Sequence, residues 1–556
     1  MSPRYTSMLV AMGWLMVSSG VLAQQRVLYT NARVITQDPA MPRAAALLVE
    51  GDRIQRVYAR VPAQRPTGAR QVDLKNAVVV PGLADAHLHL TALGAKARQV
   101  DLRGTRSAGE AVARVKDFVN RGGAGEPIIG FGWDHNDWTP RAFPERGLLD
   151  AALGNQVVIL YRIDGHAAWV STAALAVGGI ARDRADPDGG RIVRDGKGDP
   201  SGVLVDNAID LVTGSLPRLT QVQLEHDVAL ATRECARLGL TQVHDMGSDV
   251  RTLQALRALE ARHALPLRVF VYLAADDPDA TKELNPQQRR RTASRVEVRG
   301  LKLYTDGALG SRGAALKQPY SDDPGNSGLL VTEPKILHER VRQVHEAGYQ
   351  VAIHAIGDRG NREALDAIGA LGKGGVSRRH RIEHAQIVDP ADIPLFKQLG
   401  VIASMQPTHA TSDMDWAEAR LGPDRLAGAY AWKTMLSSGV ALAFGSDAPV
   451  ESADPTWGLF AATQRTDHDG APKGGWLPGE KLSPDQALAG FTSGAAYAVG
   501  REDELGVLRA GALADFTVLD GDPADPATRL LHLKVLRTVV GGEQAFPPTT
   551  STSDIP

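Results

Sequence analysis

The sequence predicts an α/β protein: a (β/α)₈ TIM barrel with a small β-sandwich domain built from both termini and an insertion after the first barrel strand. Three observations support this prediction. Strand-like segments lie near both ends of the chain, the long middle alternates apolar strands with helical segments, and one interval is too long for a single strand–helix step. The 556 residues suffice for a barrel and accessory units.

The composition is that of a folded soluble protein, with 43% hydrophobic and 23% charged residues. A net charge of −2 and the lack of any basic block argue against nucleic acid and against anionic membranes as partners. The single cysteine, Cys235, cannot form an internal disulfide, and we expect it to be a small buried residue in a helical segment.

Residues 1–23 are typical of a signal peptide. Arg4 provides the positive region, Met8 to Val17 the short apolar core, and Val21-Leu22-Ala23 the small-residue cleavage site. The apolar core is too short for a comfortable membrane span, so an uncleaved anchor is the less favoured alternative. We expect cleavage after Ala23, no stable membrane insertion of the mature chain, and export to the periplasm or the medium.

The strand-rich ends are assigned to one domain, with residues 24–80 as its first part and residues 496–556 as its second part and tail. The segment from Leu47 to Ile54 is expected to form a hairpin that turns at Gly51-Asp52. Ala514 to Leu519 and Val535 to Val540 are expected strands of the second part. Each part has too few strands to be stable alone, so we expect the two to pair.

Residues 81–495 are assigned to the barrel. Eight expected strands alternate with helical segments such as Ile336 to Ala347, and the interval of about 99–225 is interpreted as an insertion that covers the barrel mouth. The active site of such a barrel lies at the carboxyl ends of the strands. The expected strands are the one that leads to His87 and the segments 239–245, 267–273, 300–307, 350–354, 381–384, 401–405 and 440–447.

The first barrel strand carries His87 and His89, after an apolar run, Ala77 to Val80, that is expected to end at Pro81-Gly82. Side chains two apart in an extended segment point to the same side, so both imidazoles can bind one ion. The pair alone is a weak signal, because such histidines more often bind no metal, and imidazole suits several transition metals.

Later strands supply four more candidate ligands: Lys302 in the fourth, His354 at the end of the fifth, His384 at the end of the sixth and Asp447 at the end of the eighth. Each has an ordinary structural interpretation. Strand histidines are usually hydrogen-bonded, strand lysines face solvent, and Ser446-Asp447 can cap a helix. Together they occupy the end of the barrel where catalytic sites are built, which favours a metal site.

These residues lie in motifs that resemble the amidohydrolase superfamily, and within it the amidohydrolase-3 group of metal-dependent hydrolases. The resemblance covers nearly all of the mature chain, and the longer motifs are specific to this group. The matching stretches are Asp85 to His89, Lys302 to Ser311, His354 to Asn361, Glu383 to Gln386, Gly445 to Pro449, Gly132 to Asp134, Asp164 to His166 and Gly511 to Asp520.

The resemblance implies a hydrolase that binds two divalent metal ions, zinc favoured over others, and acts on an amide-type small molecule. The ions activate a water molecule and polarise the scissile carbonyl. Asp447 takes the proton of that water and returns one to the leaving nitrogen. The residues implied for the metals are His87, His89 and Asp447 for one ion, His354 and His384 for the other, and Lys302, N-carboxylated, as the bridge between them.

Residues of the insertion and of one barrel loop are weaker candidates. His166 is assigned a catalytic role, through contact with the substrate or its oxyanion, although a structural histidine fits its sequence equally well. Trp133, Asp134 and His409 are expected to line the pocket, with a core position as the alternative for the tryptophan. His244-Asp245 ends a strand where it can orient metal ligands.

Two other functions stay open. One is a mononuclear deaminase of the same superfamily, which typically has a glutamate three residues after the fifth-strand histidine; here that position is Gly357, and Lys302 would lack a role. The other is a non-catalytic binding protein on the same barrel, which should have lost a ligand, yet none is missing.

We favour hydrolysis of a C–N bond other than a peptide bond, in an N-acyl or N-formyl amine, an N-acyl amino acid, a cyclic amide or a carbamate. The sequence leaves the oligomeric state open, although a homodimer is common among relatives.

Overall fold

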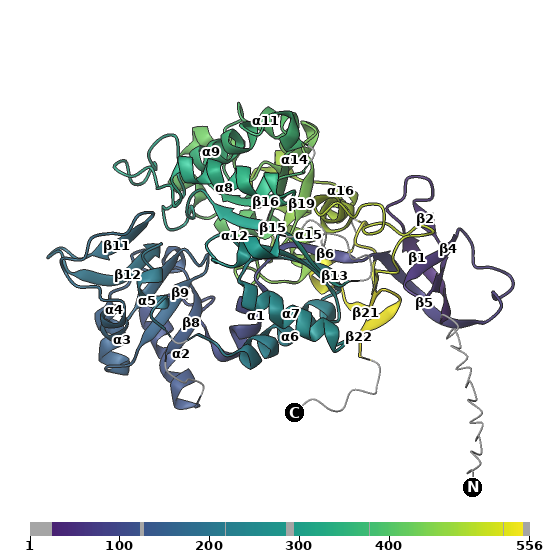
Figure 1. The fold of residues 1–556 in the computed structure, drawn as a ribbon, viewed down its shortest axis with the longest axis horizontal. Coiled ribbons are helices and arrows are strands. Elements are labelled where there is room, and N and C mark those ends of the chain that lie inside the picture. The colour runs from purple at the N-terminus through teal and green to yellow at the C-terminus, as the bar shows by residue number, and fades with distance from the viewer. Residues whose placement is uncertain are drawn as a thin grey trace, which may run out of the picture.

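The computed structural model describes residues 25–548, except for 123–126, 217, 285–293, 377 and 526–527. The expected signal peptide, residues 1–23, lies outside the described residues, as do residues 549–556. The described chain forms three sheets, and Figure 1 shows a central barrel between two smaller units.

Eight parallel strands form the barrel, as the sequence predicts. They follow one another around the sheet in chain order, each hydrogen-bonded to the next. The first and eighth strands meet where Asp447 N donates to His87 O over 2.6 Å and Leu88 forms a bridge with Ala448. The strands are β6 (Leu83–Leu88), β13 (Leu240–Ser248), β14 (Arg268–Ala274), β15 (Val296–Tyr304), β16 (Gln350–Ala355), β17 (Arg381–His384), β18 (Ile402–Met405) and β19 (Leu442–Phe444).

Helices surround the barrel because their apolar faces pack against the outward-facing side chains of the strands. In α8 (Pro334–Glu346), expected from 336 to 347, the buried face is Leu337, Val341 and Val344. α6 (Gln221–Arg237) contains Cys235, which is buried and free as expected. The other helices of this part are α1 (Leu90–Ala95), α7 (Val250–Ala261), α9 (Asp358–Gly369), α10 (Lys373–Val376), α11 (Ile393–Gln398), α12 (Pro407–Asp413), α13 (Ala417–Leu421), α14 (Trp432–Ser437), α15 (Pro455–Gln464), α16 (Pro484–Ala489) and α17 (Ala495–Ala498).

Strands from both ends of the chain join one eight-stranded sheet. The predicted hairpin is present, since Glu50 pairs with Arg53 across Gly51-Asp52. The run Ala77–Val80 belongs to this sheet, in β5, and the first barrel strand begins only at Leu83, after Gly82. The members are β1 (Arg26–Ile35), β2 (Arg43–Ala44), β3 (Ala46–Glu50), β4 (Arg53–Tyr58), β5 (Ala69–Pro81), β20 (Phe516–Leu519), β21 (Val535–Val540) and β22 (Glu543–Phe546).

The long interval after the first barrel strand folds as a separate unit. Its six-stranded sheet has the order β11-β12-β10-β9-β8-β7 and an apolar core that includes Trp133 and Trp169. Its strands are β7 (Val100–Asp101), β8 (Ile128–Trp133), β9 (Val158–Arg162), β10 (Ala167–Val170), β11 (Gly190–Arg194) and β12 (Pro200–Asp206). Its helices are α2 (Ala108–Asn120), α3 (Arg146–Leu153), α4 (Thr172–Val177) and α5 (Asp210–Thr213).

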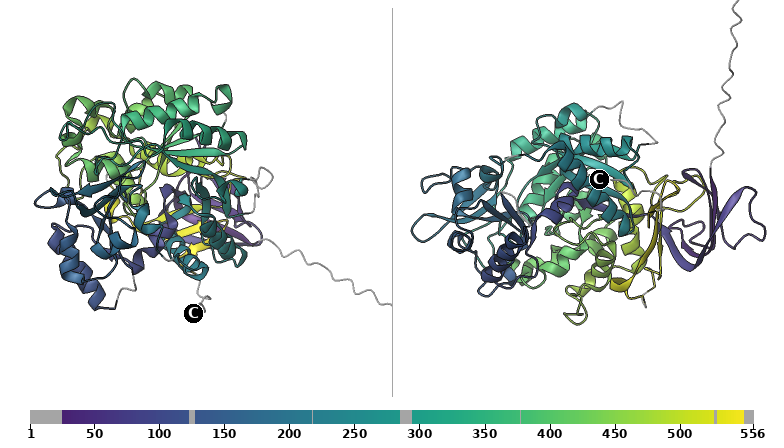
Figure 2. Two further views of the ribbon diagram at one scale, coloured as in Figure 1. Left: turned by 60° about the vertical axis from the view of Figure 1, so that its left-hand side comes forward. Right: turned by 90° about the horizontal axis from the view of Figure 1, so that it is seen from below.

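Figures 1 and 2 place the insertion and the terminal sheet on opposite sides of the barrel. At the amino ends of the strands, Arg268 of β14 donates to Asp515 beside β20 over 2.7 and 3.1 Å, and Thr517 Oγ1 donates to Gly239 O over 2.7 Å. The insertion contributes to a cavity at the carboxyl ends. Within the described ranges, no helix is long and apolar enough to cross a membrane.

Candidate metal centre

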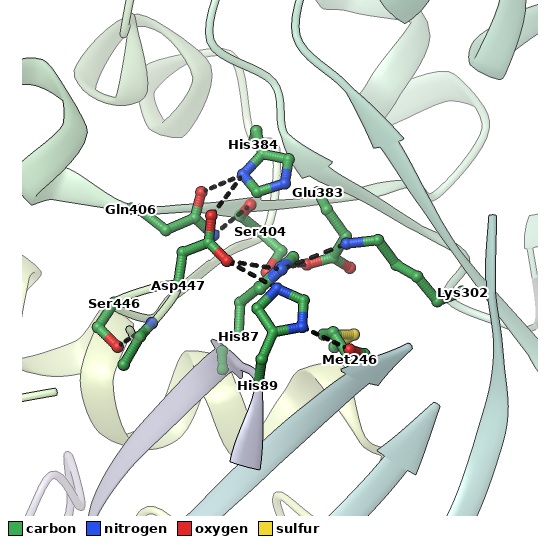
Figure 3. A network of polar contacts seen from close by, with 12 residues as sticks. His87, His89, Met246, Lys302, Glu383, His384, Ser404, Gln406, Ser446 and Asp447 are labelled. Carbon is green, nitrogen blue, oxygen red and sulfur yellow. Dashed lines mark hydrogen bonds and ion pairs between the residues drawn. The ribbon is translucent and has the colours of Figure 1, made fainter. Parts of the chain in front are cut away.

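Figure 3 shows five of the six predicted metal ligands close together at the carboxyl end of the barrel: His87, His89, Lys302, His384 and Asp447. The sixth, His354, adjoins them, because its ring centroid lies 4.6 Å from that of His384. The fold therefore brings all six predicted ligands together, although they lie in or just after five different strands, between positions 87 and 447 of the chain.

Hydrogen bonds on the far side of the rings fix how His87 and His89 present their nitrogens. His89 Nδ1 lies 2.7 Å from Met246 O, which can only accept, so Nδ1 carries the hydrogen. His87 Nδ1 lies 2.7 Å from Glu383 Oε2, and a buried carboxylate likewise accepts. Burial favours the neutral ring and holds the pKa of His87 well below its usual value. Both Nε2 atoms therefore present lone pairs to the centre.

Asp447 places its carboxylate opposite these lone pairs. Its Oδ1 lies 3.0 Å from His89 Nε2 and 3.4 Å from His87 Nε2, and it has no hydrogen-bond partner among the described residues. Ligand atoms of His87, His384 and Asp447 lie within 4.8 Å of one another. An oxygen and several ring nitrogens with converging lone pairs are a donor set for a cation.

Lys302 enters the same cluster without a counter-ion. The residue is 1% exposed, and Nζ lies 3.2 Å from His87 Nε2. It forms no ion pair with any residue that the structure describes. A buried ammonium without a partner is costly, and burial lowers the pKa of Lys302 to about 8.

His384 and His354 complete the cluster from the next two strands. His384 Nδ1 lies 2.8 Å from Gln406 Oε1, and His354 Nε2 lies 3.4 Å from Gly307 O. Burial holds the pKa of both rings well below the usual value, so both are neutral near pH 7. The φ angles of His384 and Asp447 are 74° and 63°, a left-handed conformation that non-glycine residues rarely adopt and that is concentrated at functional sites.

An ion pair inside the barrel supports His87. Arg381 and Glu383, two apart on β17, are fully buried and form two hydrogen bonds of 2.8 and 3.0 Å. Arg381 also donates to Ser404 Oγ over 2.7 Å and lies 2.9 Å from His244 Nδ1. Sequence reasoning missed this pair, although two charged residues on one side of an apolar strand are a signal for it.

Buried aspartates hold the loops that carry the ligands. Asp85 accepts hydrogen bonds from the backbone N–H groups of His87 and Ser446, both over 3.0 Å, and so joins the first strand to the loop after the eighth. Asp245 accepts from Leu90 N over 3.0 Å and fixes the start of α1, the orienting position that the sequence suggested for His244-Asp245.

A cavity of about 1000 Å³ lies over the cluster and is lined by the barrel and the insertion together. Asp134, His166 and His409 line it, as the sequence predicts. Trp133 does not: it is fully buried in the core of the insertion, where Nε1 donates to Leu160 O over 2.6 Å. The prediction that Trp133 lines the pocket is wrong, and its alternative, a core position, is what the structure shows. Neighbouring residues of an extended segment point to opposite sides, so Asp134 faces the cavity and Trp133 does not.

The insertion brings two charged groupings to this cavity. Asp134 Oδ1 accepts from the buried Arg162 over 2.5 Å, and Arg162 also pairs with Asp164. His166 Nδ1 lies 2.7 Å from Asp206 Oδ1. Burial opposes protonation of the ring, but this hydrogen bond and the charges of Asp206, Asp164 and Asp306 together outweigh burial and raise the pKa of His166. Neither Arg162 nor Asp206 was predicted, because their role depends on residues far away in the chain.

His409 lies near the cluster on the barrel side. Gln386 Nε2 lies 2.8 Å from His409 Nδ1. The other ring nitrogen, His409 Nε2, lies 3.7 Å from Asp447 Oδ2. This buried Nε2 has no hydrogen-bond partner among the described residues. His409 can therefore interact with Asp447 or with a molecule bound in the cavity.

The chain resembles known proteins in both sequence and fold. The amidohydrolase family model matches residues 70–546. The chain is 34% identical to the putative amidohydrolase YtcJ of Bacillus subtilis, over 90% of this chain and 97% of that protein. It is 32% identical to the protein LONG AFTER FAR-RED 3 of Arabidopsis thaliana (95% and 92%) and 27% identical to the N-substituted formamide deformylase of Arthrobacter pascens (94% and 98%). An uncharacterized metal-dependent hydrolase of Pyrococcus horikoshii OT3 superimposes with a TM-score of 0.74 at 29% identity, over 91% of this chain and 99% of that one.

Replacing Glu383 with glutamine removes the charge that balances Arg381 and weakens the hydrogen bond that orients His87. We expect the affinity of the centre for a divalent metal to fall about 10- to 100-fold, as is usual when the outer partner of a metal-bound histidine is lost. Competition with a chelator measures this affinity. Glu346→Gln, in an exposed pair with Arg342, is the control and should leave it unchanged. Equal affinities in the two variants would show that His87 needs no anionic partner.

Proposed function

The chain belongs to the amidohydrolase family, and from this premise we propose that it is a metal-dependent hydrolase of a carbon–nitrogen bond other than a peptide bond. One observation carries the proposal: neutral imidazoles, a carboxylate and a buried lysine converge beneath a cavity large enough for a small molecule. Several electron-pair donors in one buried place need a cation to offset their desolvation.

We propose that this donor set holds two divalent ions, and zinc is our first candidate because imidazole and carboxylate ligands suit it. His87, His89 and Asp447 would hold one ion, and His354 and His384 the other. Such ions, when bound, acidify a water molecule and polarise a carbonyl group.

Lys302 fits this centre poorly as an ammonium, because it would lie among cations. We propose that its neutral amine adds carbon dioxide, forming an N–C bond and releasing one proton. The resulting carbamate would supply anionic oxygen ligands to both ions. The absence of an ion pair to Lys302 among the described residues supports this proposal, since a carbamate needs no carboxylate beside it.

Asp447 is the residue that we propose to move protons. It takes a proton from the water that adds to the carbonyl carbon, and returns one to the nitrogen as the C–N bond breaks, so that the products are a carboxylic acid and an amine. Its carboxylate is suited to this role because it lines the cavity and has one buried oxygen without a hydrogen-bond partner among the described residues. From the insertion, the protonated ring of His166, which its raised pKa favours, would donate a hydrogen bond from Nε2 to the carbonyl oxygen as negative charge develops there.

The proposed substrates are N-acyl or N-formyl amines, N-acyl amino acids, cyclic amides and carbamates. The relative from Arthrobacter pascens acts, by its name, on N-substituted formamides, and its similarity extends over 94% of this chain. A cavity of about 1000 Å³ supports a small-molecule substrate with a sizeable group on one side of the amide.

The geometry argues against the mononuclear deaminase. The glutamate of that reaction would have to occupy position 357, three after His354. A Cβ on Gly357 would lie 2.0 Å from Ala315 O, so a side chain does not fit there. The non-catalytic alternative is disfavoured because all six predicted ligands are present and close together.

We also propose that the protein is exported. The support is the sequence of residues 1–23, with its positive residue, apolar core and small-residue cleavage site. Amino-terminal sequencing of the protein recovered from the periplasm or medium should begin at Gln24. A protein found only in the cytoplasm, with Met1 retained, would contradict export.

Elemental analysis of the mature protein, purified without chelator, should give close to two metal ions per chain. Lys302→Ala should lower this content, with partial recovery when small carboxylates are added, because they can replace the bridging oxygens. Lys335→Ala, at an exposed position of α8, is the control. A content close to one ion in the wild type would favour the deaminase, and full content in Lys302→Ala would contradict the bridging role.

Asp447→Asn should keep metal but lower kcat for amide hydrolysis by a factor of about 10² to 10⁴. The amide can still ligate weakly, but it cannot carry a proton. Steady-state kinetics and elemental analysis of the same preparation measure both effects. Unchanged turnover would exclude Asp447 as the proton carrier.

A further inference from the structure

We propose that Asp206 is a positioning residue that holds His166 over the metal centre, and that glycines of the loop after the fourth barrel strand provide the space for Asp206. The effect on catalysis rests on the proposed function. The positioning itself is a statement about geometry and is independent of the substrate.

His166 is brought to the metal centre by the insertion and not by the barrel. It lies just before β10, and its ring centroid is 4.9 Å from that of His354. Nδ1 lies 2.7 Å from Asp206 Oδ1, an acceptor, so Nδ1 carries a hydrogen. Within the described part of the chain, Nε2 has no hydrogen-bond partner, and His166 lines the cavity. Asp206 therefore determines which nitrogen of His166 a bound substrate meets.

Asp206 is itself fixed by its surroundings. It ends β12, where its N–H donates to His166 O over 3.0 Å, and its side chain is only 2% exposed. Its φ of 50° is in the left-handed region, which aspartate tolerates better than most residues. The backbone and the side chain of Asp206 thus both contact His166.

The carboxylate of Asp206 lies against two glycines of the barrel loop. A Cβ on Gly307 would lie 2.6 and 2.7 Å from its two oxygens, and a Cβ on Gly313 would lie 2.6 Å from Oδ2. Neither glycine has a positive φ. The need for glycine at these two positions is therefore explained by the close approach of Asp206, because neither has a backbone conformation that only glycine favours.

The same loop makes room for a second side chain of the insertion. A Cβ on Gly310 would lie 2.7 Å from both terminal nitrogens of Arg162, the buried guanidinium described above. Beside it, Arg420 of α13 donates to Asn136 Oδ1 of the insertion over 2.6 Å and to Gly310 O over 3.3 Å. Glycines of the loop thus lie against one acidic and one basic side chain of the insertion.

On its other side, this loop contacts the metal centre. Thr305 donates to His354 O from its backbone over 2.9 Å and from its hydroxyl over 2.7 Å, and Gly307 O lies 3.4 Å from His354 Nε2. This loop therefore contacts both the candidate metal ligand His354 and Asp206. Through Asp206 it also positions His166. This relation gives a physical role to Gly307 and Gly310 of the motif from Lys302 to Ser311, and to Gly313 just after it.

The first test compares Gly307→Ala with Gly325→Ala. Both glycines lie between β15 and α8 and neither has a positive φ, but a Cβ on Gly325 meets nothing within 4 Å. In crystal structures of the metal-loaded proteins, we expect Gly307→Ala to displace Asp206 and the ring of His166. Its kcat should fall about 10- to 100-fold, with metal content and KM close to those of the wild type. Gly325→Ala should match the wild type in every measurement.

The second test is a double-mutant cycle. Asp206→Asn keeps the shape of the side chain and suits the left-handed backbone, so the variant should fold and bind metal. We expect its kcat to fall about 10- to 100-fold. Combined with His166→Asn, it should reduce kcat no further than His166→Asn alone, because Asp206 acts through His166.

Additive losses in the double variant, full activity of Asp206→Asn, or an unmoved His166 ring in Gly307→Ala would each overturn the proposal. A wild-type enzyme that hydrolyses no amide would overturn the proposed function instead. In that case the ring positions in Gly307→Ala and Gly325→Ala decide the positioning role on their own.

Discussion

The burial of electron-pair donors at one end of the barrel is the constraint on which the rest of the site depends. The imidazoles of His87, His354 and His384 are held neutral there by desolvation, which lowers the pKa of each. In His87 and His89, Nδ1 is hydrogen-bonded to an acceptor. Lone pairs that face one another gain nothing unless a cation lies between them. The buried ion pair of Arg381 and Glu383 belongs to the same arrangement, because it lets a carboxylate reach His87 without an unpaired charge in the barrel.

The barrel, the terminal sheet and the insertion make different contributions to the site. The parallel strands bring the candidate ligands together at one end of the barrel, since each strand is hydrogen-bonded to its neighbours. The terminal sheet contacts the amino ends, far from the chemistry, and contributes stability through contacts such as that of Arg268 with Asp515. The insertion contributes part of the cavity wall, including His166, whereas the six candidate metal ligands come from the barrel.

The loop after the fourth strand connects two of these units. Thr305 of this loop donates hydrogen bonds to His354 O, and glycines of the loop lie against the side chains of Asp206 and Arg162. Such close approach of charged groups to the backbone requires residues without a Cβ. The glycines of this motif are thus a consequence of how closely the insertion must lie over the metal centre.

Local sequence patterns predict the eight barrel strands, the pairing of strands from both ends of the chain and the order of the six candidate ligands. Alternation, apolar runs and turn residues are local signals, and ligand-type residues at successive strand ends meet in any parallel barrel. The sequence did not place Trp133, whose side of the strand depends on which face the insertion buries. It also could not reveal Glu383 behind His87 or Asp206 behind His166. Those pairs are 296 and 40 positions apart, and only the tertiary structure decides which distant side chains share a buried place.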